Sequence, residues 1–99
     1  MARSAKTLMR ADDVWRPRLV ARARLKFDPI AQQEMILFPE AALALNETGA
    51  AIVRLCDGAL SVDEIVDRLS KKYGDAERIS LTREVLDFLG TIRARGLLR

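Results

Sequence analysis

The chain contains no histidine and a single cysteine, Cys56, among its 99 residues. Histidine is the commonest general base and a frequent zinc ligand, so its absence removes most acid–base mechanisms and most metal sites. One cysteine cannot form a disulfide within the chain, and without a histidine to activate it we expect Cys56 to be a small buried hydrophobic residue. Glycine-rich phosphate loops are missing as well. We therefore expect a protein that is not an enzyme and holds no cofactor.

Long apolar runs are also missing. No stretch approaches the roughly 18 apolar residues that a membrane span needs. The N-terminal sequence MARSAKTLMRADD has basic residues without the apolar centre of a secretory signal. We expect a cytoplasmic protein with no membrane partner. Its length and its 49% of hydrophobic residues suffice for one small domain with a modest core.

Net positive charge is confined to the N-terminal part of the chain. Residues 1–26 hold eight Lys and Arg against two Asp, whereas residues 27–99 hold nine against twelve Asp and Glu. The two parts therefore carry net charges of +6 and −3, within a formal total of +3. The C-terminal part presents no cationic field to phosphates, so we do not expect a nucleic-acid partner.

A tail or linker over residues 1–14 is predicted to precede a hairpin, and residues 15–99 are predicted to form the domain. From Leu19 to Phe27 the sequence LVARARLKF alternates in a way that is typical of a half-buried strand. Asp28-Pro29 supplies a turn, and Glu34–Phe38 is predicted to be the returning strand.

The stretch Ala41–Leu55 permits two interpretations. Alanine and leucine favour a single long helix, because they lead the helix propensity scale. Asn46 and Gly49 oppose it, since asparagine is a strong N-cap and an interior glycine costs about 1 kcal/mol. We predict a break at Asn46, which leaves Ala41–Leu45 as a short extended segment against its own propensity.

Two of the three predicted helices have clear boundary signals. The first runs from the break to Gly58, which is expected at its C′ position. The second begins at the capping box formed by Ser61 and Glu64, carries an apolar stripe at helical spacing, and ends before Gly74.

The third predicted helix has a wider apolar face than a core-facing helix requires. Ser80 is expected to cap it and Gly96 to follow its end. At about 100° per residue its apolar positions cover about 160°, against about 100° for a simple core stripe. These positions are Leu81, Val85, Leu86, Phe88, Leu89 and Ile92. Such a face is most simply buried on two sides, or its surplus edge, expected at Leu86 and Leu89, faces a ligand.

Several short motifs follow one order along the chain. They are RP at 16–17, FPE at 38–40, LNETGAAI at 45–52, LCDG at 55–58 and VDEIV at 62–66. As an ordered set they resemble the PqqD family of pyrroloquinoline quinone (PQQ) biosynthesis, and the likeness runs from about Arg16 to Leu98. Arg22-Ala23 departs from the family, where many relatives have an Arg-Gly pair.

The resemblance implies an α+β, winged helix-turn-helix-like fold with a three-stranded antiparallel N-terminal sheet followed by three helices. Residues 41–45 would be the third strand. The family is non-catalytic: it is a peptide chaperone and a recognition element of pathways that modify ribosomally made peptides (RiPPs). It binds the precursor peptide PqqA and presents it to PqqE, a radical S-adenosylmethionine enzyme. Some members are fused behind the C protein of the pathway, so the PqqC protein or domain is a further expected partner.

The same resemblance implies where the peptide binds. An unpaired third strand offers N–H and C=O groups to an extended peptide, and the third helix would form the other wall. The expected peptide-binding residues are Ala41, Ala42, Leu43, Ala44, Leu45, Leu81, Val85, Leu86, Phe88 and Leu89.

A winged-helix DNA-binding regulator is the alternative function, because it shares this fold. Its recognition helix usually reads bases from the N-terminal half. The third predicted helix carries only Arg83, Arg93 and Arg95 against Glu84 and Asp87, and its cations lie mostly near the C-terminal end. The charge pattern therefore favours the peptide-binding function.

Three further features stay open at the level of sequence. Trp15 is either an anchor for a partner or a staple that packs the entry of the chain to the sheet. The row Arg22, Arg24 and Lys26 is most simply a solvated strand face, although it would also suit an acidic partner. An open sheet edge permits a monomer or a homodimer.

Overall fold

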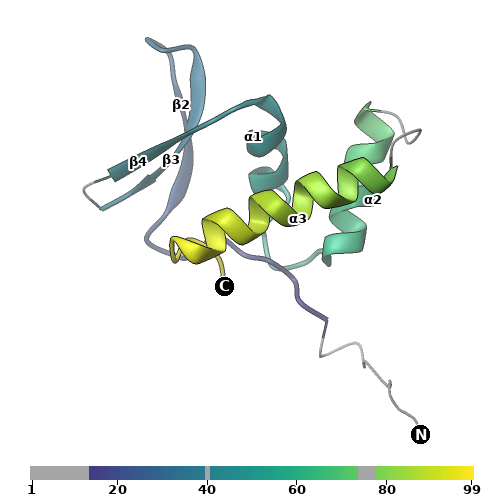
Figure 1. The fold of residues 1–99 in the computed structure, drawn as a ribbon. Coiled ribbons are helices and arrows are strands. Elements are labelled where there is room, and N and C mark those ends of the chain that lie inside the picture. The colour runs from purple at the N-terminus through teal and green to yellow at the C-terminus, as the bar shows by residue number, and fades with distance from the viewer. Residues whose placement is uncertain (1–13, 40, 74–77) are drawn as a thin grey trace, which may run out of the picture.

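A computed structural model describes residues 14–39, 41–73 and 78–99, so almost all of the predicted tail lies outside the described residues. Three strands precede three helices along the chain (Figure 1). The elements are β2 (Arg24–Asp28), β3 (Gln33–Phe38), β4 (Ala41–Leu45), α1 (Glu47–Arg54), α2 (Val62–Tyr73) and α3 (Arg78–Ala94). The strands form one antiparallel sheet in the order β2-β3-β4, and α1 lies against it. The predicted fold class is confirmed.

The first strand is shorter than predicted. A turn, closed by the bond from the Ala23 N–H to the Val20 carbonyl (3.0 Å), separates Leu19 from β2, which begins at Arg24. Leu19 instead forms an isolated bridge with Leu98. Phe27 is 46% exposed, although the alternation predicts an inward side chain, because the far end of the β2–β3 hairpin projects beyond the helices (Figure 1).

The predicted break at Asn46 is confirmed. Its Oδ1 accepts a hydrogen bond from the Gly49 N–H at 2.7 Å, while its own backbone stays extended. Residues 41–45 pair with β3, so tertiary pairing overrides the helix propensity of AALAL. Leu45 faces the core with 4% exposure, and Leu43 is half-buried on the same side of the strand.

Two predicted helix boundaries are wrong. The helix α1 ends at Arg54, so Gly58 is not its C′ residue; it sits at φ +84° in the following loop and donates its N–H to the Pro17 carbonyl at 3.0 Å. The helix α3 begins at Arg78, two residues before the predicted cap at Ser80. Gly96 does follow the end of α3, at φ +77°.

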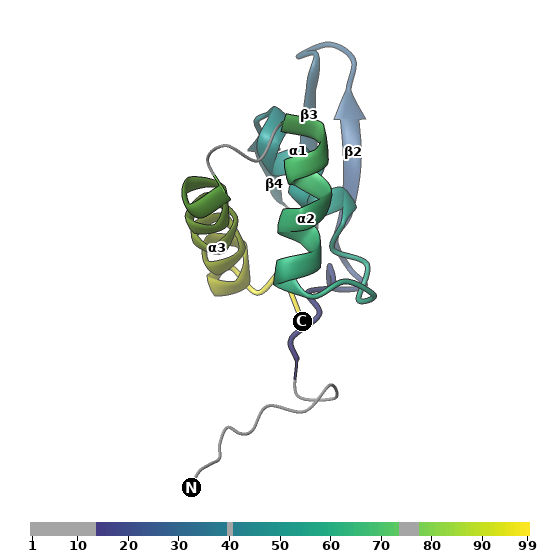
Figure 2. The ribbon, with the colours of Figure 1, turned by 90° about the vertical axis from the view of Figure 1, so that its right-hand side faces the viewer.

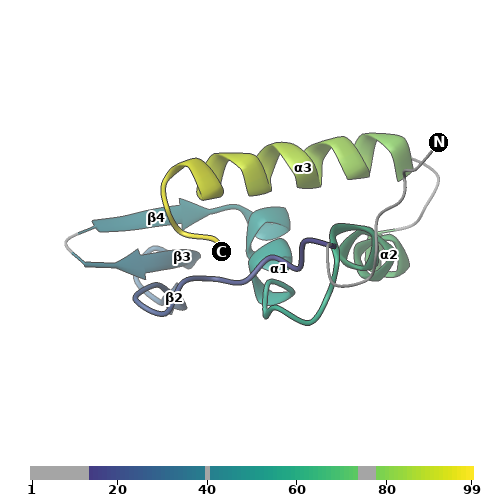
Figure 3. The same ribbon diagram turned by 90° about the horizontal axis from the view of Figure 1, so that it is seen from below.

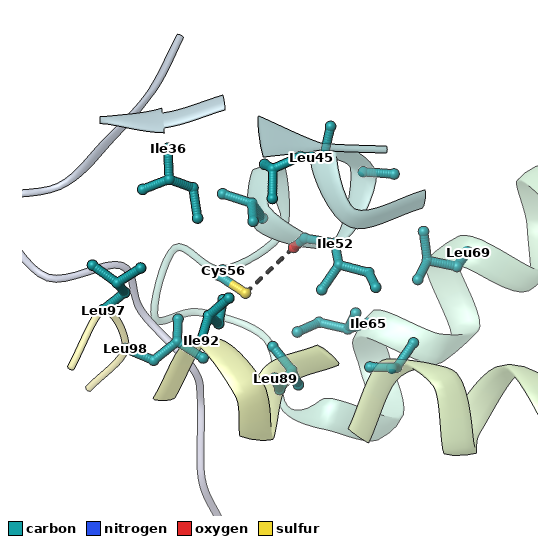
Figure 4. Packing of buried hydrophobic residues seen from close by; sticks show 14 of the residues in the cluster. Ile36, Leu45, Ile52, Cys56, Ile65, Leu69, Leu89, Ile92, Leu97 and Leu98 are labelled. Atoms are coloured by element: carbon teal, nitrogen blue, oxygen red, sulfur yellow. Dashed lines mark hydrogen bonds between the residues drawn. The ribbon is translucent and has the colours of Figure 1, made fainter. Parts of the chain in front are cut away.

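The core lies where the sheet and the three helices meet (Figure 4). Its fully buried side chains include Ile36 of β3, Ile52 of α1, Ile65 of α2 and Leu89 of α3. Cys56 belongs to this core, and its Sγ donates to the Ile52 carbonyl at 3.3 Å. Burial, followed by the nearby negative charge of Asp57, raises the pKa of the thiol to about 12. Cys56 is therefore a packed, unreactive residue, as expected.

The two ends of the described domain are held together by backbone pairing. Residue Arg18 exchanges two hydrogen bonds with Arg99, at 3.3 and 2.8 Å, and the Val20 N–H donates to the Leu97 carbonyl at 2.9 Å. Trp15 adds a bond from its Nε1 to the Arg99 carbonyl at 3.0 Å, and the Arg93 guanidinium lies 4.7 Å from the centre of its ring. Trp15 is thus a staple, although it packs on the C-terminus and not on the sheet.

Replacement of the Asn46 cap is expected to destabilise the whole domain. Asn46→Ala leaves the Gly49 N–H without its acceptor, and we expect it to lower the free energy of unfolding by about 1 kcal/mol. Asn46→Asp retains an acceptor oxygen and is the matched control, expected within about 0.5 kcal/mol of the original chain. Urea unfolding followed by circular dichroism measures both. Equal stability of the alanine and aspartate variants would contradict this role.

The capping box of α2 predicts a pH-dependent contribution to stability. The Glu64 Oε1 accepts the Ser61 N–H at 2.8 Å, and the Glu64 N–H donates to the Ser61 hydroxyl at 3.2 Å. The bond from the Ser61 backbone, and then that from its side chain, lowers the pKa of Glu64 below its ordinary value of 4.5. A lowered folded-state pKa stabilises the protein above the unfolded value, and this is lost as the pH falls through the folded value.

Glu64→Gln is therefore expected to be less stable than the original chain above pH 4.5. The difference in the free energy of unfolding should shrink below that pH and vanish once the carboxylate is protonated in both states. The glutamine oxygen still accepts the Ser61 N–H, so the variant removes only the charge. Urea unfolding at a series of pH values from about 3 to about 7 measures this difference. A pH-independent difference would overturn this linkage.

Candidate functional site

The strand β4 has a free edge. It lies at one end of the sheet and pairs only with β3 among the described strands, so alternate N–H and C=O groups point away from the sheet. The side chains of Ala41, Ala42 and Ala44 are small, uncharged and exposed. Charged side chains are a common protection of sheet edges, and β4 has none. The edge is chemically ready to pair with another extended chain.

The helix α3 runs beside this edge. Figures 2 and 3 both show β4 as the strand nearest to α3, and in Figure 3 the C-terminal half of the helix lies along it. Along the backbone α3 packs chiefly against α2. The Phe88 ring marks the side of α3 that faces the end of β4 and the start of α1, because it packs on Gly49. A Cβ added to Gly49 would lie 3.0 Å from the Phe88 Cε1. Gly49 is three residues beyond the Asn46 that ends β4.

The predicted helical residues fall into three groups. Val85 and Leu89 are 0% and 1% exposed, so they build the core behind the wall and are not available to a peptide. Leu81 and Phe88 are half-buried and packed against that core. The expectation that Leu89 stays at the surface is therefore wrong.

Leu86 lies on the opposite side of α3. It is 50% exposed, as the sequence predicts, but it stands two residues from Phe88 and hence about 160° around the helix from it. It lines a hollow with other α3 side chains and with no residue of β4. The structure therefore does not bring Leu86 together with residues 41–45.

Sequence analysis missed the polar residues on the side of α3 that carries Phe88. Glu84 and Thr91 stand four residues before and three residues after it, within about 60° around the helix, and both are exposed. The Thr91 hydroxyl donates to the Asp87 carbonyl at 3.0 Å. Their helical spacing from Phe88 places them on its side of the helix, but they are polar and so do not belong to the predicted apolar face.

Neither a metal site nor a membrane-spanning helix is found in the part of the chain that the structure describes. Within residues 14–39, 41–73 and 78–99, the His, Cys, Asp and Glu side chains form no cluster that could hold a metal ion. Over the same ranges no helix has the length and apolar character to cross a bilayer.

A polar hollow of about 580 Å³ lies at the C-terminal end of β4. The lining comes chiefly from the β2–β3 hairpin and from α1, with Leu45 of β4 and Lys72 of α2. An ion pair between Arg54 and Glu34, at 2.9 Å, closes part of it. The lining carries both acidic and basic side chains, so the hollow offers no concentrated charge of one sign to a ligand.

Several known proteins have similar sequences. Residues 34–98 match the family Coenzyme PQQ synthesis protein D (PqqD). A protein of Rhodopseudomonas palustris (strain ATCC BAA-98 / CGA009) named PqqA binding protein is 43% identical over 83 residues, which are 84% of this chain and 80% of that protein. A Methylococcus capsulatus protein of the same name is 45% identical over 65 residues, 65% of this chain and 69% of its own.

Two solved structures are also similar. One is the solution structure of the PqqD part of Methylobacterium extorquens PqqCD, described as a functional, stand-alone RiPP recognition element. It is 29% identical, with a TM-score of 0.73 over 94% of this chain and 96% of the other. The crystal structure of PqqD from Xanthomonas campestris is 27% identical, with a TM-score of 0.56 over 82% and 89%. By sequence pattern, relatives and fold together, the chain belongs to the PqqD family of PQQ biosynthesis.

Proposed function

We propose that this chain binds the PqqA precursor peptide and acts as a non-catalytic adaptor in PQQ biosynthesis. The observation that carries the proposal is the free, uncharged edge of β4 beside α3. Support comes from relatives such as the Rhodopseudomonas palustris protein, whose name is PqqA binding protein. The similar Methylobacterium extorquens domain is described as a RiPP recognition element, which agrees with the same role.

The peptide adds to the sheet as a fourth strand. Its backbone pairs with the outward N–H and C=O groups of residues 41–45, which supplies affinity that does not depend on sequence. Its alternate side chains point toward α3, where half-buried Phe88 and Leu81 offer apolar contact and Glu84 and Thr91 offer polar contact. Because Val85 and Leu89 fix this side of the helix from within the core, the wall is rigid and needs little ordering on binding.

The adaptor then presents the bound peptide to PqqE, and the PqqC protein or domain is a second partner. The proposal for PqqC is supported by the similar structure, which is the D part of a PqqCD protein. This role requires no reactive side chain from the chain itself. The buried Cys56, with a pKa of about 12, is consistent with that requirement.

An NMR titration with synthetic PqqA peptides tests strand addition. In a β ladder, successive N–H groups of the peptide point alternately toward and away from β4. Two peptides, N-methylated at alternate positions in complementary registers, should therefore differ: one loses binding and the other retains it. The unmodified peptide should shift the amide resonances of residues 41–45. Equal binding by both methylated peptides would contradict strand addition, and shifts caused only by duplex DNA would favour a DNA-binding regulator.

A paired substitution on α3 tests the helical wall. Thr91→Lys places a long cation on the side of Phe88, and we expect it to raise the Kd for the peptide about tenfold, which corresponds to about 1.4 kcal/mol. Gly90→Lys adds the same side chain at the adjacent position, where an added Cβ meets nothing within 4 Å, and should leave the Kd unchanged. Isothermal titration calorimetry measures both. The reverse order of effects would place the peptide on another face of α3.

A further inference from the structure

The face of the sheet that points away from the core carries apolar side chains that the core does not use. In β3, Ile36 is fully buried and points into the core in Figure 4, so its neighbours Met35 and Leu37 point to the other face. Both are half-buried, yet neither packs against the core cluster, unlike Phe38. The helix α1 contacts all three strands, and its Ile52 lies in the core with Ile36. Met35 and Leu37 therefore belong to the face that α1 leaves open.

The register of the sheet arranges this face in two rows. Residues directly opposite each other on antiparallel strands share a face. Each row therefore runs from a cation on β2, through an apolar side chain on β3, to an alanine on β4. The rows are Arg24, Leu37 and Ala42, and Lys26, Met35 and Ala44. We define these six residues as the outer sheet face.

The positive charge of the outer sheet face is not balanced within the part of the chain that the structure describes. There, neither Arg24 nor Lys26 has a hydrogen bond or an ion pair through its side chain. Arg22, the third member of the basic row, instead donates to a backbone carbonyl beyond α3 at 3.4 Å. Asp28 is the only acid on this side of the described strands, and its Oδ1 accepts a backbone N–H of the hairpin loop at 3.0 Å. Charge complementarity therefore favours an acidic partner.

Two hollows adjoin on the outer sheet face and share Leu37 in their linings. One, of about 330 Å³, is lined by Arg24, Leu37 and Pro39 among others. The other, of about 300 Å³, includes Lys26, Met35 and Leu37. Each hollow thus combines apolar side chains with one of the two cations. A protein surface that carries Asp or Glu beside apolar side chains satisfies both, whereas the phosphates of a nucleic acid leave the apolar pair without a partner.

The outer sheet face continues onto a peptide bound at β4. Two residues separate Phe38 from Ala41, so the pair that closes this tight link is a hydrogen-bonded pair. Such pairs alternate with pairs that are not hydrogen-bonded, so Ala42 and Ala44 direct their N–H and C=O groups toward the free edge. Peptide residues that pair with these two alanines place their side chains on the same face. Each row therefore gains one peptide side chain beside its alanine.

We propose that the outer sheet face docks an acidic surface with an apolar centre on the enzyme that modifies the bound peptide. This inference rests on the proposed function, because the added strand brings the peptide to that face. The enzyme contacts the two rows and the peptide side chains beside Ala42 and Ala44 together. The remaining peptide side chains point toward α3 and stay held by the chain. Alternation along one strand thus divides the peptide into residues that are presented and residues that are retained.

Methyl NMR of the full chain locates the docking surface. Methyl groups of Met, Leu and Ala are labelled, and purified PqqE is added with and without the synthetic PqqA peptide. PqqE should broaden the methyl resonances of Met35, Leu37, Ala42 and Ala44 in both samples, because the chain itself forms the face. Leu86, on the outward side of α3, is the internal control and should stay sharp. Broadening confined to Leu86, or broadening of the outer sheet face by duplex DNA and not by PqqE, would overturn the proposal.

Charge reversal provides a second test, read by isothermal titration calorimetry. Arg24→Glu combined with Lys26→Glu should raise the Kd for PqqE about tenfold. The Kd for the PqqA peptide should not change, because β3 separates both positions from β4. Arg83→Glu combined with Arg95→Glu makes the same change in net charge at exposed positions elsewhere and should leave the Kd for PqqE unchanged. Circular dichroism checks that each variant is folded.

The two titrations separate this proposal from the proposed function. Loss of PqqE binding in the β2 variant, with peptide binding retained, supports docking at the outer sheet face. Equal effects of the two double variants on the Kd for PqqE, or no effect of the β2 variant, would overturn docking there and leave the peptide site intact. An original chain that binds PqqE but not the peptide would instead contradict the proposed function.

Discussion

The hydrogen bond from the Gly49 N–H to the Asn46 side chain fixes the point on which the rest of the fold depends. It ends β4 and starts α1, and together with the pairing of residues 41–45 to β3 it makes them a strand with a free edge and not the first turns of a helix. Gly49 also accepts the Phe88 ring, because its missing Cβ leaves the room that the ring fills. The elements β4, α1 and α3 therefore meet at two residues: Asn46, which caps α1, and Gly49, which leaves room for the Phe88 ring.

The order and type of the elements were predictable because each depends on local chemistry. The capping box at Ser61 and the cap at Asn46 are set by neighbouring residues, and both form as the sequence indicates. Errors arose where a distant segment decides. Leu19 leaves the predicted strand because Leu98 pairs with it, and Gly58 turns to meet the Pro17 carbonyl. No local pattern contains these partners.

The candidate site likewise has one part that local sequence predicts and one part that depends on a distant contact. The strand was predictable from the break at Asn46 and the family likeness, whereas the wall of α3 was not. An arc of apolar residues gives the width of a helix face but not which edge of that face meets β4. The contact between Phe88 and Gly49 shows which edge of α3 faces the end of β4. With the helix in this orientation, Phe88 faces the sheet and Leu86 faces away from it. The apolar face predicted for the third helix is therefore divided between two sides of α3.

The pairing of residues 18–20 with residues 97–99 sets a condition on when the fold can be completed during synthesis. Trp15 bonds a carbonyl 84 positions later, and the core side chains Leu97 and Leu98 enter from the C-terminal end. A chain still attached to the ribosome holds its most recent residues inside the exit tunnel, where they cannot reach Arg18. The sheet and first helix are able to form during synthesis, but the core closes only after Arg99 has emerged.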